Sequence, residues 1–136
     1  MSITTTATAT PARSGGLTRW LLLDAAMSGS AGVALAAGGA WLDGVLGAPS
    51  AFLIGVGAFL LLYAGFLALL TRIGAPTPAV WLVVVGNAGW AVASVVVVLA
   101  DWLTLTTAGN VMTLAQAAAV ALFAELQFTA LRKRAS

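Results

Sequence analysis

The sequence has no cysteine and no histidine. Disulfide bonds, thiol redox chemistry, Cys/His metal sites and imidazole acid–base catalysis are therefore excluded. Charged residues are also scarce. The 136 residues include six basic and four acidic ones. Proton-linked chemistry would have to use those four acids or the single tyrosine, Tyr63. We therefore expect no enzyme, no resident cofactor and no metal centre.

Apolar residues dominate what is present. They make up 61% of the chain, against 7% charged residues. A soluble domain carries about 25% charged residues, which keep its surface hydrated. Most of this surface is thus expected to face lipid, and the bilayer is the expected partner. The net charge of +2 comes from basic residues scattered over separate segments, which make no patch for a nucleic acid.

Four apolar runs each approach or exceed the roughly 20 residues that a helix needs to cross a bilayer. Short segments rich in glycine, proline and aspartate separate them, so neighbouring helices should run antiparallel. The sequence predicts an all-α, up-down-up-down bundle of four transmembrane helices within residues 17–132. Residues 1–16 are predicted to be a disordered tail and 133–136 a basic end. The spans are about 18–41, 50–72, 79–100 and 108–131.

Basic residues lie on only one side of these spans. Arg13, Arg19, Arg72 and the run 132–134 share that side, whereas the two opposite connections carry Asp43 and Asp101. The positive-inside bias assigns the basic side to the cytoplasm. Both termini are therefore predicted to be cytoplasmic, and the expected location is a bacterial inner membrane.

Ionisable side chains within spans are costly and are the first functional candidates. Counting at about 1.5 Å per residue places Asp24 and Glu125 roughly 7–11 Å from the inner boundary. Tyr63 and Asn87 fall slightly deeper on the same side, and Ser28 shares a helix face with Asp24 at i,i+4 spacing. These five residues form the candidate intramembrane polar or ion site.

A second polar set is interpreted as a helix-packing or partner face. Ser94 and Trp90 lie on the third span, and Gln116 and Gln127 lie eleven residues apart on the fourth, nearly aligned. Glu125 lies about 180° from Gln116 at 100° per residue. The last helix therefore has two polar sides, of which one can face the bundle while the other meets a partner or a second copy.

Two functional hypotheses follow, beside a purely structural one in which Arg19 compensates Asp24, and Arg132 or Lys133 compensates Glu125. The first is a non-enzymatic accessory subunit or scaffold that packs against other membrane helices. The second is a small, oligomeric ion- or proton-coupled transporter in which Asp24 and Glu125 bind the ion. A lipid-acting enzyme is less favoured, because Asp24 is isolated from other catalytic groups.

Leu22-Leu23-Asp24 and the segment Asn87 to Ser94 resemble a broad group of short, four-span bacterial membrane proteins of uncharacterised function. That resemblance implies the fold and a membrane location, but no activity. In size and span number the chain also looks like the small multidrug resistance transporters, whose coupling acid is a glutamate in the first span. Here Asp24 lies nearer the inner end, and the motif that surrounds the glutamate in that family is absent.

Overall fold

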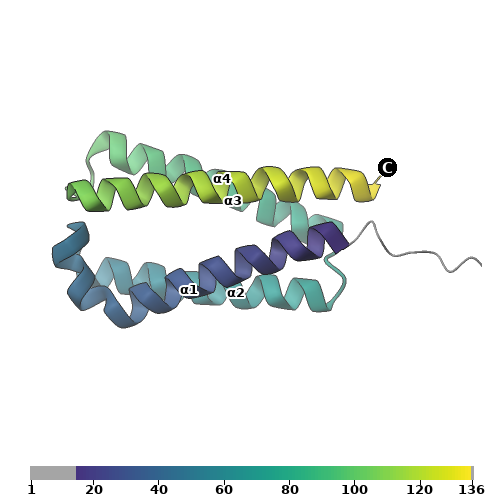
Figure 1. Cartoon of the computed structure of the whole chain (residues 1–136), viewed down its shortest axis with the longest axis horizontal. Coiled ribbons are helices and arrows are strands. Elements are labelled where there is room, and N and C mark those ends of the chain that lie inside the picture. The colour runs from purple at the N-terminus through teal and green to yellow at the C-terminus, as the bar shows by residue number, and fades with distance from the viewer. Residues whose placement is uncertain (1–14, 136) are drawn as a thin grey trace, which may run out of the picture.

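The computed structural model describes residues 15–135, which form four α-helices and contain no strand. All four helices are long and apolar enough to cross a bilayer. They run up and down in turn, as the sequence predicts (Figure 1). The all-α four-helix bundle is thus confirmed. Its helices are α1 (Gly15–Leu46), α2 (Ser50–Arg72), α3 (Thr77–Ala100) and α4 (Thr107–Ala135).

α2 and α3 begin and end within two residues of the predicted spans, whereas α1 extends beyond its predicted span at both ends. It begins at Gly15, inside the predicted tail, and continues through Asp43 and Gly44 to Leu46. Asp43, predicted to lie in the first connection, is therefore part of the helix. The chain instead turns at Gly47, which has a left-handed φ of 82° and donates a backbone hydrogen bond to the carbonyl of Asp43. Residues 1–14 of the predicted tail lie outside the described residues.

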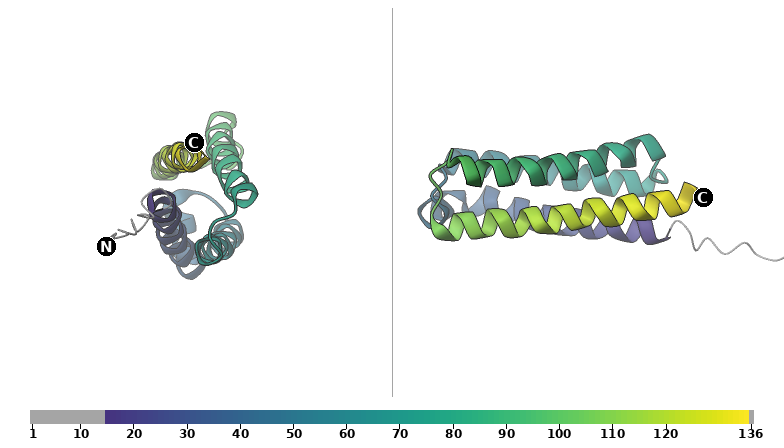
Figure 2. Two further views of the ribbon diagram at one scale, coloured as in Figure 1. Left: turned by 90° about the vertical axis from the view of Figure 1, so that its right-hand side faces the viewer. Right: turned by 90° about the horizontal axis from the view of Figure 1, so that it is seen from above.

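The bundle consists of two helical hairpins, α1–α2 and α3–α4, viewed end-on in Figure 2. Close packing occurs within each hairpin, and α1 and α4 pack together to join the two. Within residues 15–135, α2 and α3 have few close backbone approaches to each other. Side chains bridge these two helices instead, which leaves room between the hairpins.

Glycine allows α1 and α2 to approach closely. A Cβ atom on Gly57 would lie 2.5 Å from the backbone nitrogen of Ala36 and 2.8 Å from the carbonyl oxygen of Gly32. A Cβ on Gly32 would in turn lie 2.9 Å from the carbonyl oxygen of Gly57. Small residues at such crossings let membrane helices gain packing energy from backbone contact. The first hairpin is therefore a tightly packed unit.

The two hairpins are fastened together at both ends. At the end where α4 begins, Thr106 donates its backbone N–H to the Leu46 carbonyl (3.0 Å) and its hydroxyl to the Val45 carbonyl (2.6 Å). At the other end, an apolar cluster draws on all four helices and on Ala75 between α2 and α3. This cluster consists of Leu17, Leu21, Leu67, Leu70, Ala75, Val80, Val83, Val84 and Leu131.

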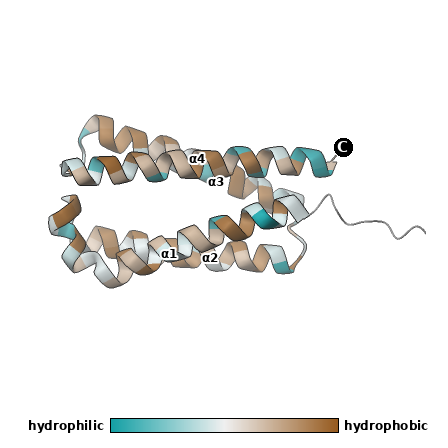
Figure 3. Cartoon of the chain, viewed as in Figure 1, coloured by the Kyte–Doolittle hydropathy of each residue, from teal (hydrophilic) through white to brown (hydrophobic). Residues whose placement is uncertain are grey.

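The basic residues of the described part of the chain lie near the end of the bundle that holds the start of α1 and the C-terminus, where Figure 3 colours the last turns of α4 as hydrophilic. Arg19 lies in the first turns of α1, and Arg72 and Arg132–Arg134 lie in the last turns of α2 and α4. Asp43 and Asp101 lie near the opposite end. The charge asymmetry seen in the sequence thus becomes an asymmetry between the two ends of one bundle.

Candidate functional site

Asp24 lies at the centre of a polar network that joins all four helices. The residue is 2% exposed. Its Oδ1 atom accepts a hydrogen bond from Ser28, one turn further along α1 (3.1 Å). Its Oδ2 atom accepts bonds from the other three helices. The donors are the Tyr63 hydroxyl on α2 (3.1 Å), the Asn87 amide on α3 (2.8 Å) and the Gln127 amide on α4 (2.8 Å).

The donors around Asp24 also bond to one another. The Tyr63 hydroxyl lies 2.8 Å from Asn87 Oδ1, and Asn87 Nδ2 lies 3.1 Å from Gln127 Oε1. The Tyr63 hydroxyl has one hydrogen, so it donates to Asp24 or to Asn87 at any moment. No buried side-chain polar atom in the described part of the chain lacks a hydrogen-bond partner. Every buried polar side-chain atom of the network therefore has a partner, and the Tyr63 hydroxyl hydrogen can change between two acceptors.

The four donors to Asp24 are all uncharged. No basic side chain is among them. Arg19, the sequence-based candidate for compensating Asp24, lies with its guanidinium carbon 5.4 Å from the Trp20 ring centroid. Arg132, one candidate for compensating Glu125, lies over the ring of Phe128 at 5.6 Å.

The structure brings together four of the five residues of the predicted polar site, Asp24, Ser28, Tyr63 and Asn87. The expectation that Glu125 joins them is not met, because Glu125 is exposed on the outer side of α4. Gln127, predicted from its position to lie on a packing or partner face, takes its place and is fully buried. Two positions along a helix correspond to about 200°, so Glu125 and Gln127 cannot face the same way.

A second polar cluster joins α3 and α4 further along the bundle. The Trp90 indole N–H donates to Gln116 Oε1 (3.0 Å). Gln116 Nε2 donates to the Ser94 hydroxyl (2.8 Å) and to the Thr113 carbonyl (3.0 Å). The Ser94 hydroxyl donates to the Trp90 carbonyl one turn earlier (2.8 Å). Gln116, Ser94 and Trp90 thus form an interhelical contact within this chain.

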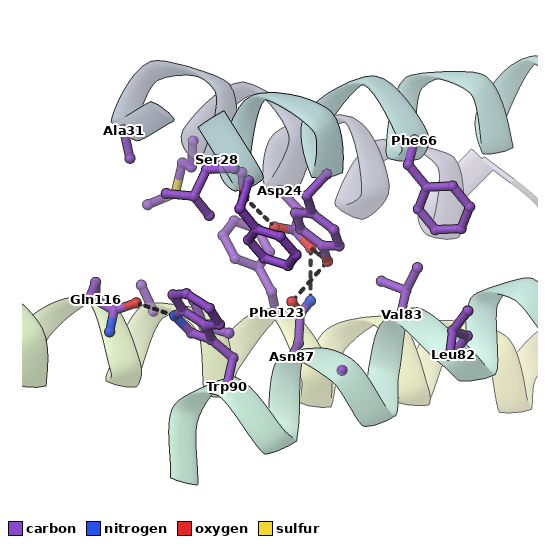
Figure 4. A pocket seen from close by; sticks show the side chains of 17 residues that line it. Asp24, Ser28, Ala31, Phe66, Leu82, Val83, Asn87, Trp90, Gln116 and Phe123 are labelled. Atoms are coloured by element: carbon purple, nitrogen blue, oxygen red, sulfur yellow. Dashed lines mark hydrogen bonds between the residues drawn. The ribbon is translucent and has the colours of Figure 1, made fainter. Parts of the chain in front are cut away.

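A cavity of about 310 Å³ lies between the two hairpins. The Asp24 network forms one polar part of its wall and the Trp90–Gln116 pair another (Figure 4). Apolar side chains from all four helices form the rest. Small-molecule sites typically measure about 300–1,000 Å³ and combine apolar walls with a few polar groups. This cavity has the size and lining of such a site.

The cavity reaches the surface of the bundle, where it is bordered by apolar residues. Phe59 of α2 and Leu82 of α3 line it and are 52% and 65% exposed. Phe66 and Gly86 on the same two helices, and Met27 on α1, are also exposed lining residues. The cavity therefore opens on an apolar part of the bundle surface.

Comparison with protein-family models, with curated proteins and with solved structures finds no match. Function must therefore be inferred from the chemistry of the site. Within residues 15–135, no three side chains among Asp, Glu, His and Cys come close enough to hold a metal ion. The arrangement offers one carboxylate, two amides, hydroxyl groups and aromatic rings around a hydrophobic space, which suits binding of a small amphipathic molecule.

Proposed function

We propose that the protein is a small membrane carrier that binds a lipophilic small molecule inside its helix bundle, with Asp24 at the polar end of the site. One observation carries this proposal. A cavity of about 310 Å³ combines a buried carboxylate with apolar walls and reaches the surface between exposed apolar side chains. A purely structural polar cluster would not need this adjoining space.

The proposed carrier lies in a bacterial cytoplasmic membrane with both ends inside. The basic residues at one end of the bundle support this orientation through the positive-inside bias. Asp24 follows Arg19 by five residues, or about 7–8 Å along a helix. The binding site is then nearer the inner leaflet than the outer one.

The route and the mode of binding follow from where the lining residues lie. The apolar part of a ligand enters from lipid past Phe59 and Leu82, so it never needs to cross water. Its polar group then meets Asp24 and the neighbouring amides. A carrier is favoured over a catalyst because Asp24 is the only acidic residue in the lining and Glu125 is elsewhere.

Two glycines on α3 provide a matched test. A Cβ added at either Gly86 or Gly89 meets nothing within 4 Å, but only Gly86 lines the cavity. Gly86→Phe should place a ring in the cavity, whereas Gly89→Phe should place one outside it. The probe is 4-bromobenzyl alcohol, a neutral molecule whose bromine quenches tryptophan fluorescence. The other four tryptophans, Trp20, Trp41, Trp81 and Trp102, are replaced by Phe so that Trp90 reports alone.

We expect saturable quenching of Trp90 in lipid nanodiscs by this alcohol. The affinity should fall at least five-fold in Gly86→Phe and stay unchanged in Gly89→Phe. Quenching that rises linearly with probe concentration, and is the same in both variants, would contradict a binding cavity.

Self-association, the expectation that one polar side of the last helix meets a second copy, has one specific observation in its favour. Glu125 is exposed on α4, about 10 Å from Arg132 along the helix at 1.5 Å per residue. A charged side chain within a span usually faces protein, so we also propose that this side of α4 contacts a second copy of the chain. A photo-crosslinking residue at position 125 should yield a covalent dimer, and one at the exposed Leu62 of α2 should not. Equal yields from the two positions would argue for random collision.

A further inference from the structure

Asp24, at the polar end of the cavity, has no positively charged hydrogen-bond partner among residues 15–135. Ser28, Tyr63, Asn87 and Gln127 donate hydrogen bonds to Asp24, but none of them brings a positive charge. Hydrogen bonds from neutral groups spread the charge of a carboxylate without cancelling it. In a low-dielectric environment the remaining charge attracts a cation far more strongly than it would in water.

The hydrogen-bond pattern limits how a ligand can approach this charge. Oδ2 accepts hydrogen bonds from the Asn87 and Gln127 amides, and a third from Tyr63 when that hydroxyl does not donate to Asn87, whereas Oδ1 accepts one, from Ser28. A ligand can therefore gain little by adding donors at Oδ2. The site is better suited to recognise positive charge near Oδ1 than an array of hydrogen-bond donors.

Aromatic rings extend from Asp24 along one wall of the cavity. Phe59 lies between Tyr63 and Trp90, with ring centroids 6.5 Å and 5.6 Å away and nearly parallel planes. All three residues line the cavity, and Tyr63 bonds directly to Asp24. The rings offer the apolar part of a ligand an aromatic wall beside the carboxylate. A carboxylate next to such a wall suits an organic cation with an apolar body.

An inorganic cation fits this site less well. Hard cations such as Ca²⁺ take about six to eight oxygen ligands, and Asp24 is the only carboxylate in the lining. Apolar side chains make up most of the remaining wall. We propose, on the basis of the carrier function above, that the ligand is a lipophilic organic cation. It is an amine or quaternary ammonium whose charge lies beside Asp24 and whose apolar part lies against Phe59 and Trp90.

Three probes of similar shape test this proposal. They are 4-bromobenzyl alcohol, 4-bromobenzylamine and 4-bromobenzyltrimethylammonium, the last permanently charged. Binding is measured by Trp90 quenching in phosphatidylcholine nanodiscs, which have no net lipid charge, with probe concentrations corrected for partition into lipid. We expect both cations to bind at least ten-fold more tightly than the alcohol.

Matched carboxylate variants assign the preference to one residue. In Asp24→Asn the two cations and the alcohol should bind with similar affinity. In Asp24→Glu the cations should still bind more tightly than the alcohol. Glu125→Gln removes the exposed carboxylate of α4 and should leave all three affinities unchanged. If Asp24→Asn does not fold, the comparison of the three probes on the chain with native Asp24 still decides the question.

The possible results distinguish the preference for a cation from the carrier function itself. Equal affinities of native Asp24 protein for the alcohol and both cations would overturn the cation inference and leave the carrier function standing. Absence of saturable binding by any of the three probes would overturn both. A cation preference that persists in Asp24→Asn would refute the role given to this carboxylate.

Discussion

Asp24 Oδ2 on α1 and Gln127 Nε2 on α4 lie 2.8 Å apart, although 103 positions separate them in the sequence. The two residues are 2% and 0% exposed. Their hydrogen bond joins the first helix to the last, and α1–α4 is the close contact that holds the two hairpins together. The network that forms the polar end of the cavity thus also stabilises the assembly of the bundle.

Replacing Gln127 should destabilise the bundle more than replacing its near neighbour Glu125. Gln127→Leu removes a donor to Asp24 and an acceptor for Asn87. Such interhelical hydrogen bonds contribute roughly 0.6–2 kcal/mol each in membrane proteins. We expect the free energy of unfolding, measured by titration with dodecyl sulfate in mixed micelles, to fall by about 1–3 kcal/mol. Glu125→Leu is the control, and a loss as large as that of Gln127→Leu would contradict a special role for the network.

Alanine at Gly57 should loosen the first hairpin, whereas alanine at Gly55 should not. The Gly57 methyl group would lie 2.5 Å from the Ala36 backbone, while at Gly55 nothing lies within 4 Å. Overpacking of this kind costs about 1–3 kcal/mol. Gly55→Ala should be neutral or gain up to about 1 kcal/mol of helix propensity. The same unfolding titration measures both, and a stabilised Gly57→Ala would show that α1 and α2 can separate freely.

Trp90 and Gln116 should be energetically coupled. Trp90→Phe removes the indole N–H that bonds to Gln116, and Gln116→Leu removes the acceptor. A double-mutant cycle on the free energy of unfolding should give a coupling of about 0.5–1.5 kcal/mol. Fully additive effects of the two substitutions would mean that this hydrogen bond contributes nothing to the contact between α3 and α4.

Single cysteines should report the orientation, because the chain has none of its own. Thr107→Cys and Ala135→Cys place exposed thiols at opposite ends of α4. In intact cells, a membrane-impermeant maleimide should label position 107 and leave position 135 unlabelled. Both should react after the membrane is permeabilised. Labelling at 135 alone would invert the topology and move the Asp24 site to the outer leaflet.

Much of the fold could be predicted from the sequence, because hydropathy and turn residues mark helices of membrane-spanning length without tertiary knowledge. The exception is the end of α1. Asp43-Gly44 has the composition of a turn, but Gly44 meets no obstacle in the helix, and the chain turns only at Gly47. The sequence offers two glycines three residues apart, Gly44 and Gly47, as turn positions. The choice between them depends on contacts of Gly47 with the distant 104–106 segment.

Counting residues from the membrane boundary could predict the depth of the site but not its full membership. Depth alone groups Asp24, Tyr63, Asn87 and Glu125. The direction of each side chain around its helix decides which of them meet, and α4 carries polar residues on two sides. The alignment of Gln127 with Gln116 was the available signal that both face inward. The cavity could not be predicted, because it depends on how side chains from four helices fill the space between the hairpins.

The sparse backbone contact between α2 and α3 has a mechanical consequence. The two hairpins are joined along the contact between α1 and α4, and also at both ends, through Thr106 and through the Leu17–Leu131 cluster. A hinge movement about the α1–α4 contact would separate α2 and α3 most in the middle of the bundle. The Tyr63 hydroxyl can follow such a movement by exchanging Asp24 for Asn87 as its acceptor. Such a movement would enlarge the cavity of about 310 Å³ between the hairpins.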